Sequence, residues 1–154
     1  MKKIIYSLLL LQIAFFGCDS KEDVNAISRI NLINYDSSLG EYYIYGVTRD
    51  SLKINHNCDY ENCSDSLIFS KKLLKESSKK FFNFLSDLKI DTLQQKYSEE
   101  GFDGIKINLT YYKNEKKKTI KFERYIHPQL EEILYELDKL VPKNYSPTSK
   151  ALLK

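Results

Sequence analysis

Few side chains in this 154-residue chain combine the types and spacing that chemistry requires. The chain contains three cysteines and two histidines. Cys58 and Cys63 lie close together, and His56 lies just before them. With a fourth ligand such as Asp59 or Glu61 this segment could bind a metal ion, whereas in an oxidising compartment the two cysteines would form a disulfide. The choice therefore depends on where the protein resides.

The N-terminus predicts the compartment. Two lysines at positions 2 and 3 precede an apolar stretch at 4–16, which is shorter than the ~20 apolar residues of a membrane-spanning helix. Gly17 then precedes Cys18. This pattern resembles the signal peptide of bacterial lipoproteins, with a departure at the last two residues of the stretch, which are both phenylalanine. The resemblance implies removal of residues 1–17, lipid attachment at Cys18, and export to the cell envelope, with the outer membrane favoured.

Export favours the disulfide over the metal site. Lipidation of Cys18 leaves Cys58 and Cys63 as a pair, and a second pair of zinc ligands is missing from the sequence. The other histidine, His127, directly precedes Pro128, where a helix is expected to begin, so we expect it to cap or pack against that helix. We therefore predict a Cys58–Cys63 disulfide, and neither a metal nor a cofactor.

The sequence lacks a recognisable catalytic motif. Neither histidine lies in a nucleophile motif, and a phosphate-binding glycine loop is missing. An acidic loop with Glu99, Glu100 and Asp103 could supply paired carboxylates for glycoside hydrolysis. We predict a non-enzymatic binding or interaction module. The alternatives are a small envelope or glycan hydrolase that uses the loop at Glu99–Asp103, and an accessory subunit of an envelope complex.

The charge of the chain argues against nucleic acid as a partner. The sequence has 24 basic and 21 acidic side chains. Without Lys2 and Lys3 these become 22 and 21, so the remaining 137 residues carry a net charge of only +1. This length suggests one domain. The predicted partners are the membrane, through Cys18, and an unknown envelope protein or glycan.

The hydrophobic pattern predicts an α+β fold. After a polar tether at 18–26, alternating apolar and polar residues predict strands, whereas apolar residues at helical spacing predict two amphipathic helices. The expected strands are 27–35, 41–48, 51–56, 105–112 and 120–123, with 66–73 as a strand or the approach to a helix; the expected helices are 75–88 and 128–141. We predict an antiparallel sheet of five to six strands within a domain at 27–142, with both helices on one face. Residues 143–154 are expected to form a flexible tail.

Two further resemblances concern bacterial lipoproteins. Tyr97, Tyr125, Pro128 and the strand at 105–112 resemble small Bacteroidetes lipoprotein domains of unknown function, which implies a similar fold and no known activity. The acidic start of the tether resembles the sorting signals of Bacteroidetes surface lipoproteins. Aspartate directly after the cysteine instead favours the inner membrane in enterobacteria, so the leaflet stays open.

Two groups of surface residues are candidates for binding. Lysines surround a predicted hairpin tip and could contact anionic head groups or polysaccharide, although a solvated turn is the favoured explanation. They are Lys113, Lys116, Lys117, Lys118 and Lys121. Tyrosines on predicted strands could form a ligand or glycan platform, although tyrosine also suits strands generally. They are Tyr42, Tyr43, Tyr45, Tyr111 and Tyr112.

Overall fold

The computed structural model describes residues 26–61, 63–101 and 104–152. The predicted signal peptide, Cys18 and all of the tether except Ala26 lie outside these ranges. The elements are β1 (Ile27–Asp36), β2 (Glu41–Thr48), β3 (Ser51–Cys58), β4 (Ser66–Lys72), α2 (Lys75–Asp87), the 3-10 turn η1 (Ile90–Thr92), β5 (Lys96–Ser98), β6 (Ile105–Lys113), β7 (Lys116–Glu123), α3 (Pro128–Asp138), the 3-10 turn η2 (Lys143–Tyr145) and α4 (Pro147–Leu152). Among these described elements, no helix is long and apolar enough to cross a membrane.

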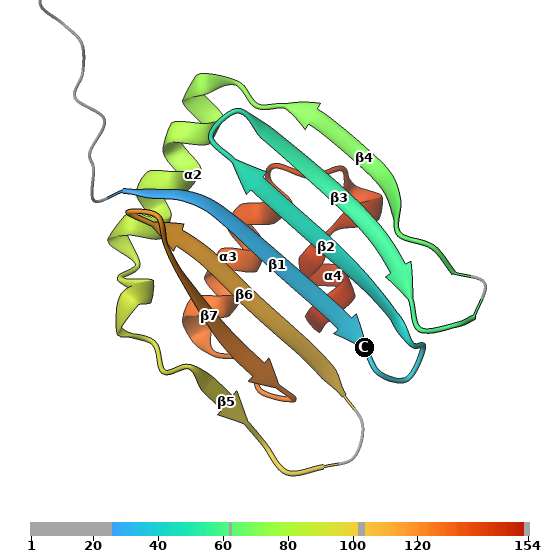
Figure 1. The fold of residues 1–154 in the computed structure, drawn as a ribbon. Coiled ribbons are helices and arrows are strands. Elements are labelled where there is room, and N and C mark those ends of the chain that lie inside the picture. The colour runs from blue at the N-terminus through green and yellow to red at the C-terminus, as the bar shows by residue number, and fades with distance from the viewer. Residues whose placement is uncertain (1–25, 62, 102–103, 153–154) are drawn as a thin grey trace, which may run out of the picture.

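The strands form one seven-stranded sheet in the order β4-β3-β2-β1-β6-β7-β5 (Figure 1). All neighbouring pairs are antiparallel except the short edge strand β5, which runs parallel to β7. The predicted α+β class with a mainly antiparallel sheet is therefore confirmed.

The three helices lie on one face of the sheet, which is the far face in Figure 1. Alternation along the strands turns every second side chain toward them. Ile30 and Leu32 of β1 are completely buried on this side, as are Leu85 of α2 and Leu134 of α3. Apolar contact between the strands and the helices therefore forms the core, and none of the described helices lies over the other face (Figure 1).

The strand and helix numbers differ from the prediction. Within residues 26–152, leaving out the undescribed positions 62, 102 and 103, there are seven strands and three α-helices rather than five to six strands and two helices. The additional strand β5 has only three residues and pairs in parallel with β7 at the sheet edge. Such a short segment has too few alternating residues to produce a pattern, so only the tertiary contact with β7 identifies it.

The predicted flexible tail also differs from the structure, because residues 143–145 form η2 and residues 147–152 form α4. The buried hydroxyl of Tyr45 donates a hydrogen bond to the Tyr145 carbonyl oxygen at 3.0 Å, and Ala151 is only 4% exposed. The helix expected at 128–141 ends earlier, at Asp138, and Pro142 instead precedes η2, after which the chain turns back onto the sheet. A helix of six residues is stabilised mainly by such tertiary contacts, and it is too short to show a clear hydrophobic periodicity in the sequence.

Candidate functional site

The face of the sheet that no described helix covers presents a regular array of side chains. We call it the open face and define it by the residues of β1, β2, β3, β6 and β7 that are directed away from the helices. They are Arg29, Asn31, Ile33, Tyr35, Tyr42, Ile44, Gly46, Thr48, Ser51, Lys53, Asn55, Asn57, Lys106, Asn108, Thr110, Tyr112, Lys117, Thr119, Lys121 and Glu123. Antiparallel sheets commonly bury one face and leave the other to solvent, so this arrangement is stable without a cover.

Two tyrosines form the end of the open face near the β1–β2 turn. Tyr35 and Tyr42 pair across β1 and β2, with ring centroids 6.1 Å apart. The Tyr35 hydroxyl donates a hydrogen bond to Asp59 Oδ2 at 2.8 Å, and this bond raises the pKa of Tyr35. Lys106 Nζ lies 5.7 Å from the centre of the Tyr35 ring. The result is an aromatic surface with a cation beside it.

Small polar side chains occupy the centre of the open face. Asn31 of β1 pairs with Gly46 on one side and Thr110 on the other. The hydroxyls of Thr110 and Thr119 are 2.9 Å apart and form a hydrogen bond. Gly46 has no side chain, so nothing projects from the sheet surface at this position, between Asn31 and Lys53. This centre offers amide and hydroxyl groups next to a small apolar patch formed by Ile33 and Ile44.

At the opposite end the Arg29 guanidinium lies 5.1 Å from the centre of the Tyr112 ring. Arg29 Nε also donates to Asn31 Oδ1 at 3.3 Å. The open face therefore repeats the combination of a tyrosine ring and a cation at both ends, with neutral polar groups between them.

The structure divides the five tyrosines of the sequence-based candidate platform between the two faces. Tyr42 and Tyr112 lie on the open face, whereas Tyr43, Tyr45 and Tyr111 point toward the helices, where Tyr45 and Tyr111 are buried. Neighbouring tyrosines point to opposite sides because side chains alternate along a strand. Tyr35 belongs to the platform and was not among the predicted candidates, although its alternation with the apolar residues of β1 gave the necessary signal.

The predicted basic hairpin tip is only partly available for binding. Lys113 forms an ion pair with Asp91 at 2.6 Å. Lys118 donates hydrogen bonds to the Asp91 and Leu93 carbonyl oxygens. These two lysines hold η1 against the β6–β7 hairpin. The remaining lysines of the tip group are exposed; they are Lys116, Lys117 and Lys121.

Cys58 and Cys63 form a disulfide in the structure, with their Cα atoms 5.7 Å apart. His56 Nε2 lies 3.6 Å from Glu41 Oε2, and the His56 ring lies 5.0 Å from that of Tyr43. Among the described residues, no group of three histidine, cysteine, aspartate or glutamate side chains could hold a metal ion. The structure thus arranges the two cysteines for a disulfide rather than as metal ligands.

The acidic loop is not arranged around a cavity in the part that the structure describes. Glu99 and Glu100 are exposed, and Asp103 lies outside the described residues. Arg124 Nε donates a hydrogen bond to the backbone carbonyl oxygen of Glu99 at 2.8 Å. This bond does not involve the Glu99 carboxylate. The other histidine, His127, accepts a hydrogen bond from the Gln129 amide at 3.2 Å and caps α3, as predicted.

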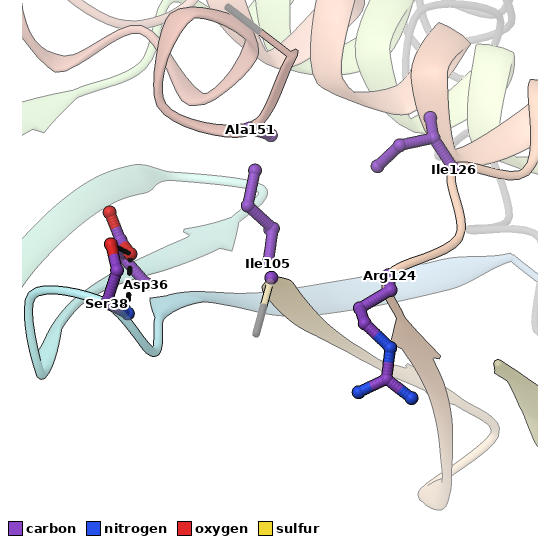
Figure 2. Close-up of a pocket in the computed structure, with 7 residues that line it drawn as sticks. Asp36, Ser38, Ile105, Arg124, Ile126 and Ala151 are labelled. Carbon is purple, nitrogen blue, oxygen red and sulfur yellow. Dashed lines mark hydrogen bonds between the residues drawn. The ribbon is translucent and has the colours of Figure 1, made fainter. Parts of the chain in front are cut away.

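A pocket of about 440 Å³ lies between the sheet end and α4 (Figure 2). Its apolar wall consists of Ile105, Ile126 and Ala151, which come from three different segments and face the same space. Asp36 at the pocket edge accepts hydrogen bonds from the Ser38 amide and hydroxyl. These bonds stabilise the β1–β2 turn, so the turn itself accounts for the polar groups of Asp36 and Ser38. The residues that line the pocket do not include a nucleophile together with an imidazole base.

No protein-family model matches this chain, and a search of curated proteins finds no match. The choice of the open face as the candidate site therefore depends on its geometry and chemistry. It combines exposure, flatness, aromatic rings and a concentration of positive charge, whereas the pocket and the acidic loop each offer less.

Proposed function

We propose that this protein is an exported lipoprotein, anchored to a bacterial membrane through Cys18, whose domain binds a component of the cell envelope without catalysing a reaction. The open face would be its binding surface. One observation supports this most: the three helices of the described residues lie on one side of the sheet, while the other side carries half-buried tyrosine and amide groups and exposed basic groups in register (Figure 1). Exposed tyrosine supplies both apolar area and a polar hydroxyl, which suits binding.

The anchor would leave the open face accessible. β1 starts at Ile27, nine residues after Cys18, and a chain of that length spans at most ~30 Å when extended. Two or more acyl chains on Cys18 would hold the protein stably on the membrane. Ile27 pairs with Lys113 beside the β6–β7 turn, so the tether would enter at this end of the sheet. The tyrosine pair Tyr35–Tyr42 lies at the other end of β1, away from that entry point.

The anchoring part of the proposal is tested by the intact mass of the full-length protein purified from its own membranes without reductant. We expect residues 18–154 with added acyl chains and two hydrogens fewer, which corresponds to lipidation at Cys18 and a Cys58–Cys63 disulfide. An unprocessed mass with free thiols would contradict export, and would return His56, Cys58 and Cys63 to consideration as a metal or redox site.

The binding part is tested with the full-length protein on isolated envelope material. Hydrogen exchange would be compared with and without polysaccharide and protein fractions from the envelope. We expect protection of amides in β1, β2 and β6, where the open face lies at the sheet centre. Protection confined to the acidic loop, together with turnover that is lost in Glu99→Gln, would instead favour the hydrolase.

A further inference from the structure

We propose that the open face binds an acidic polysaccharide, that is, a sugar polymer carrying carboxylate or other anionic groups. This inference rests on the proposed function, because it names the ligand class of the same surface. Its basis is the juxtaposition, on one face of the sheet, of exposed cations, neutral hydrogen-bonding groups and tyrosine rings.

The charge on the open face is strongly unbalanced. Five exposed basic side chains lie on it, namely Arg29, Lys53, Lys106, Lys117 and Lys121. None of the ion pairs formed by described residues includes one of these five. Glu123, the acidic side chain within the defined set, is paired with Lys96 at 2.8 Å and lies opposite Lys106 across β6 and β7. At the edge of the face Asp59 and Asp65 accept hydrogen bonds from Tyr35 and Asn57, so the basic side chains still outnumber the acidic ones.

The helix side of the molecule shows that this imbalance is local. Helices α2 to α4, together with the turn between α3 and α4, carry six basic and six acidic side chains. The chain without its first 17 residues has nearly equal numbers of basic and acidic groups. Positive charge is therefore concentrated on the open face, and an anionic ligand is the complement of this surface.

The uncharged groups between the cations favour a polysaccharide over other anions. Asn31, Asn108 and Thr110 present amide and hydroxyl groups that can donate to and accept from sugar hydroxyls. Tyr42 offers a ring against which the apolar face of a sugar can lie, whereas the Tyr112 ring has the Arg29 guanidinium over it. A ligand recognised by charge alone would not require these groups.

The arrangement also suits a polymer rather than a single sugar. The cations lie on β3, β1, β6 and β7, and β3 is four strand spacings from β7 in the sheet order. At ~4.8 Å per spacing this is roughly 19 Å, which a run of several sugars would cover. The face is uninterrupted over this width, because neither a helix nor a described loop crosses it in Figure 1.

The experiment measures binding of the full-length protein, purified in detergent, to polygalacturonate, with dextran as the uncharged polymer. We expect binding to polygalacturonate that weakens as salt is raised, and little binding to dextran. The double variant K106Q/K121Q should bind about tenfold more weakly. The variant Tyr42→Ala should lose a similar factor, because it removes a stacking surface.

Matched controls come from the helix side. Lys79 and Lys80 are exposed on α2, and Tyr135 is exposed on α3. The variants K79Q/K80Q and Tyr135→Ala remove the same charge and the same ring, so they should leave binding unchanged. Equal weakening by both sets would overturn the proposal, since it would indicate nonspecific attraction to the whole surface. Circular dichroism and the urea midpoint of each variant would identify any variant that fails to fold.

The other outcomes separate this inference from the proposed function. Dextran bound as tightly as polygalacturonate through Tyr42 would overturn the acidic class while leaving a binding module. Equal binding to oligothymidylate, or to phosphatidylglycerol vesicles, would overturn it in favour of nucleic acid or membrane. Absence of binding to all these probes would overturn the inference, whereas hydrogen exchange with envelope fractions that protects the open face would still support the proposed function.

Discussion

The two faces of the sheet are built from the same strands and have opposite roles. On the helix side Leu32, Tyr45 and Leu109 are completely buried, and their packing stabilises the fold. On the open side the adjacent residues are polar, aromatic or basic, apart from the pair Ile33 and Ile44. Because the buried core lies on the helix side, we expect substitutions on the open face to cost less stability than substitutions in the core.

The largest expected difference between the two faces comes from substituting two adjacent residues of β1 that point to opposite sides of the sheet. Leu32→Ala removes a buried side chain and should lower the free energy of unfolding by about 2–5 kcal/mol. Ile33→Ala, on the open face beside Ile44, should lower it by about 1 kcal/mol or less. Urea denaturation of the two variants measures both values. Equal losses would show that the open face is covered by another surface in solution.

The buried tyrosines predict a loss of stability at alkaline pH. Burial raises the pKa of Tyr45 and of Tyr111 well above the usual value of 10.0, and the hydrogen bond to Asp91 adds to the effect at Tyr111. The folded state therefore keeps protons that the unfolded state loses above pH 10.0. Stability present below that pH should fall as pH rises, by up to ~1.4 kcal/mol per pH unit for each tyrosine.

Urea unfolding at a series of alkaline pH values checks this dependence. Tyr45→Phe should make the loss shallower, because one of the two buried phenols is gone. Tyr42→Phe should leave the slope as in the unmodified protein. A slope unaffected by Tyr45→Phe would contradict the assignment of the alkaline transition to the covered face.

A smaller difference is expected between the same two tyrosines at neutral pH. Tyr45→Phe leaves the Tyr145 carbonyl oxygen without its donor, so it should cost about 1 kcal/mol of unfolding free energy. Tyr42→Phe should be nearly neutral in stability. Thermal denaturation compares the two, and hydrogen exchange should show faster exchange in α4 only for Tyr45→Phe.

The smallest expected change in stability concerns the ion pair between Lys113 and Asp91. Hydrogen bonds from Lys113 and Tyr111 lower the pKa of Asp91. Its ionised form therefore stabilises the fold above its usual pKa of 3.8, and this contribution is lost as pH falls through the lowered value. Because the Asp91 side chain is 49% exposed, solvent screens the interaction, and we expect Asp91→Asn to cost at most about 1 kcal/mol at neutral pH.

The control for Asp91→Asn is Lys53→Gln on the open face. Acid unfolding followed by circular dichroism should be shallower for Asp91→Asn, whereas Lys53→Gln should leave the acid profile unchanged. A large stability change in Lys53→Gln would show that this open-face cation belongs to the fold rather than to a binding surface.

Much of the fold and part of the candidate site could be predicted from local pattern. Alternation identified β1, β2, β3 and β6, and helical spacing identified α2 and α3. Leu74 was included in the predicted stripe of α2 but is 76% exposed, because the helix begins only at Lys75. The positions of Tyr42 and Tyr112 on strands could be predicted, but which tyrosines share a face required the register between strands.

The sequence by itself determined the alternating strands, the two longer amphipathic helices and the helix cap at His127, because each depends on residues close together in the chain. Only the tertiary structure decided that β5 joins β7, that α4 packs beneath the sheet, and that Lys113 and Lys118 are held by η1. It also brought the five open-face cations together. These features depend on contacts between segments distant in sequence, and local propensity carries no information about such contacts.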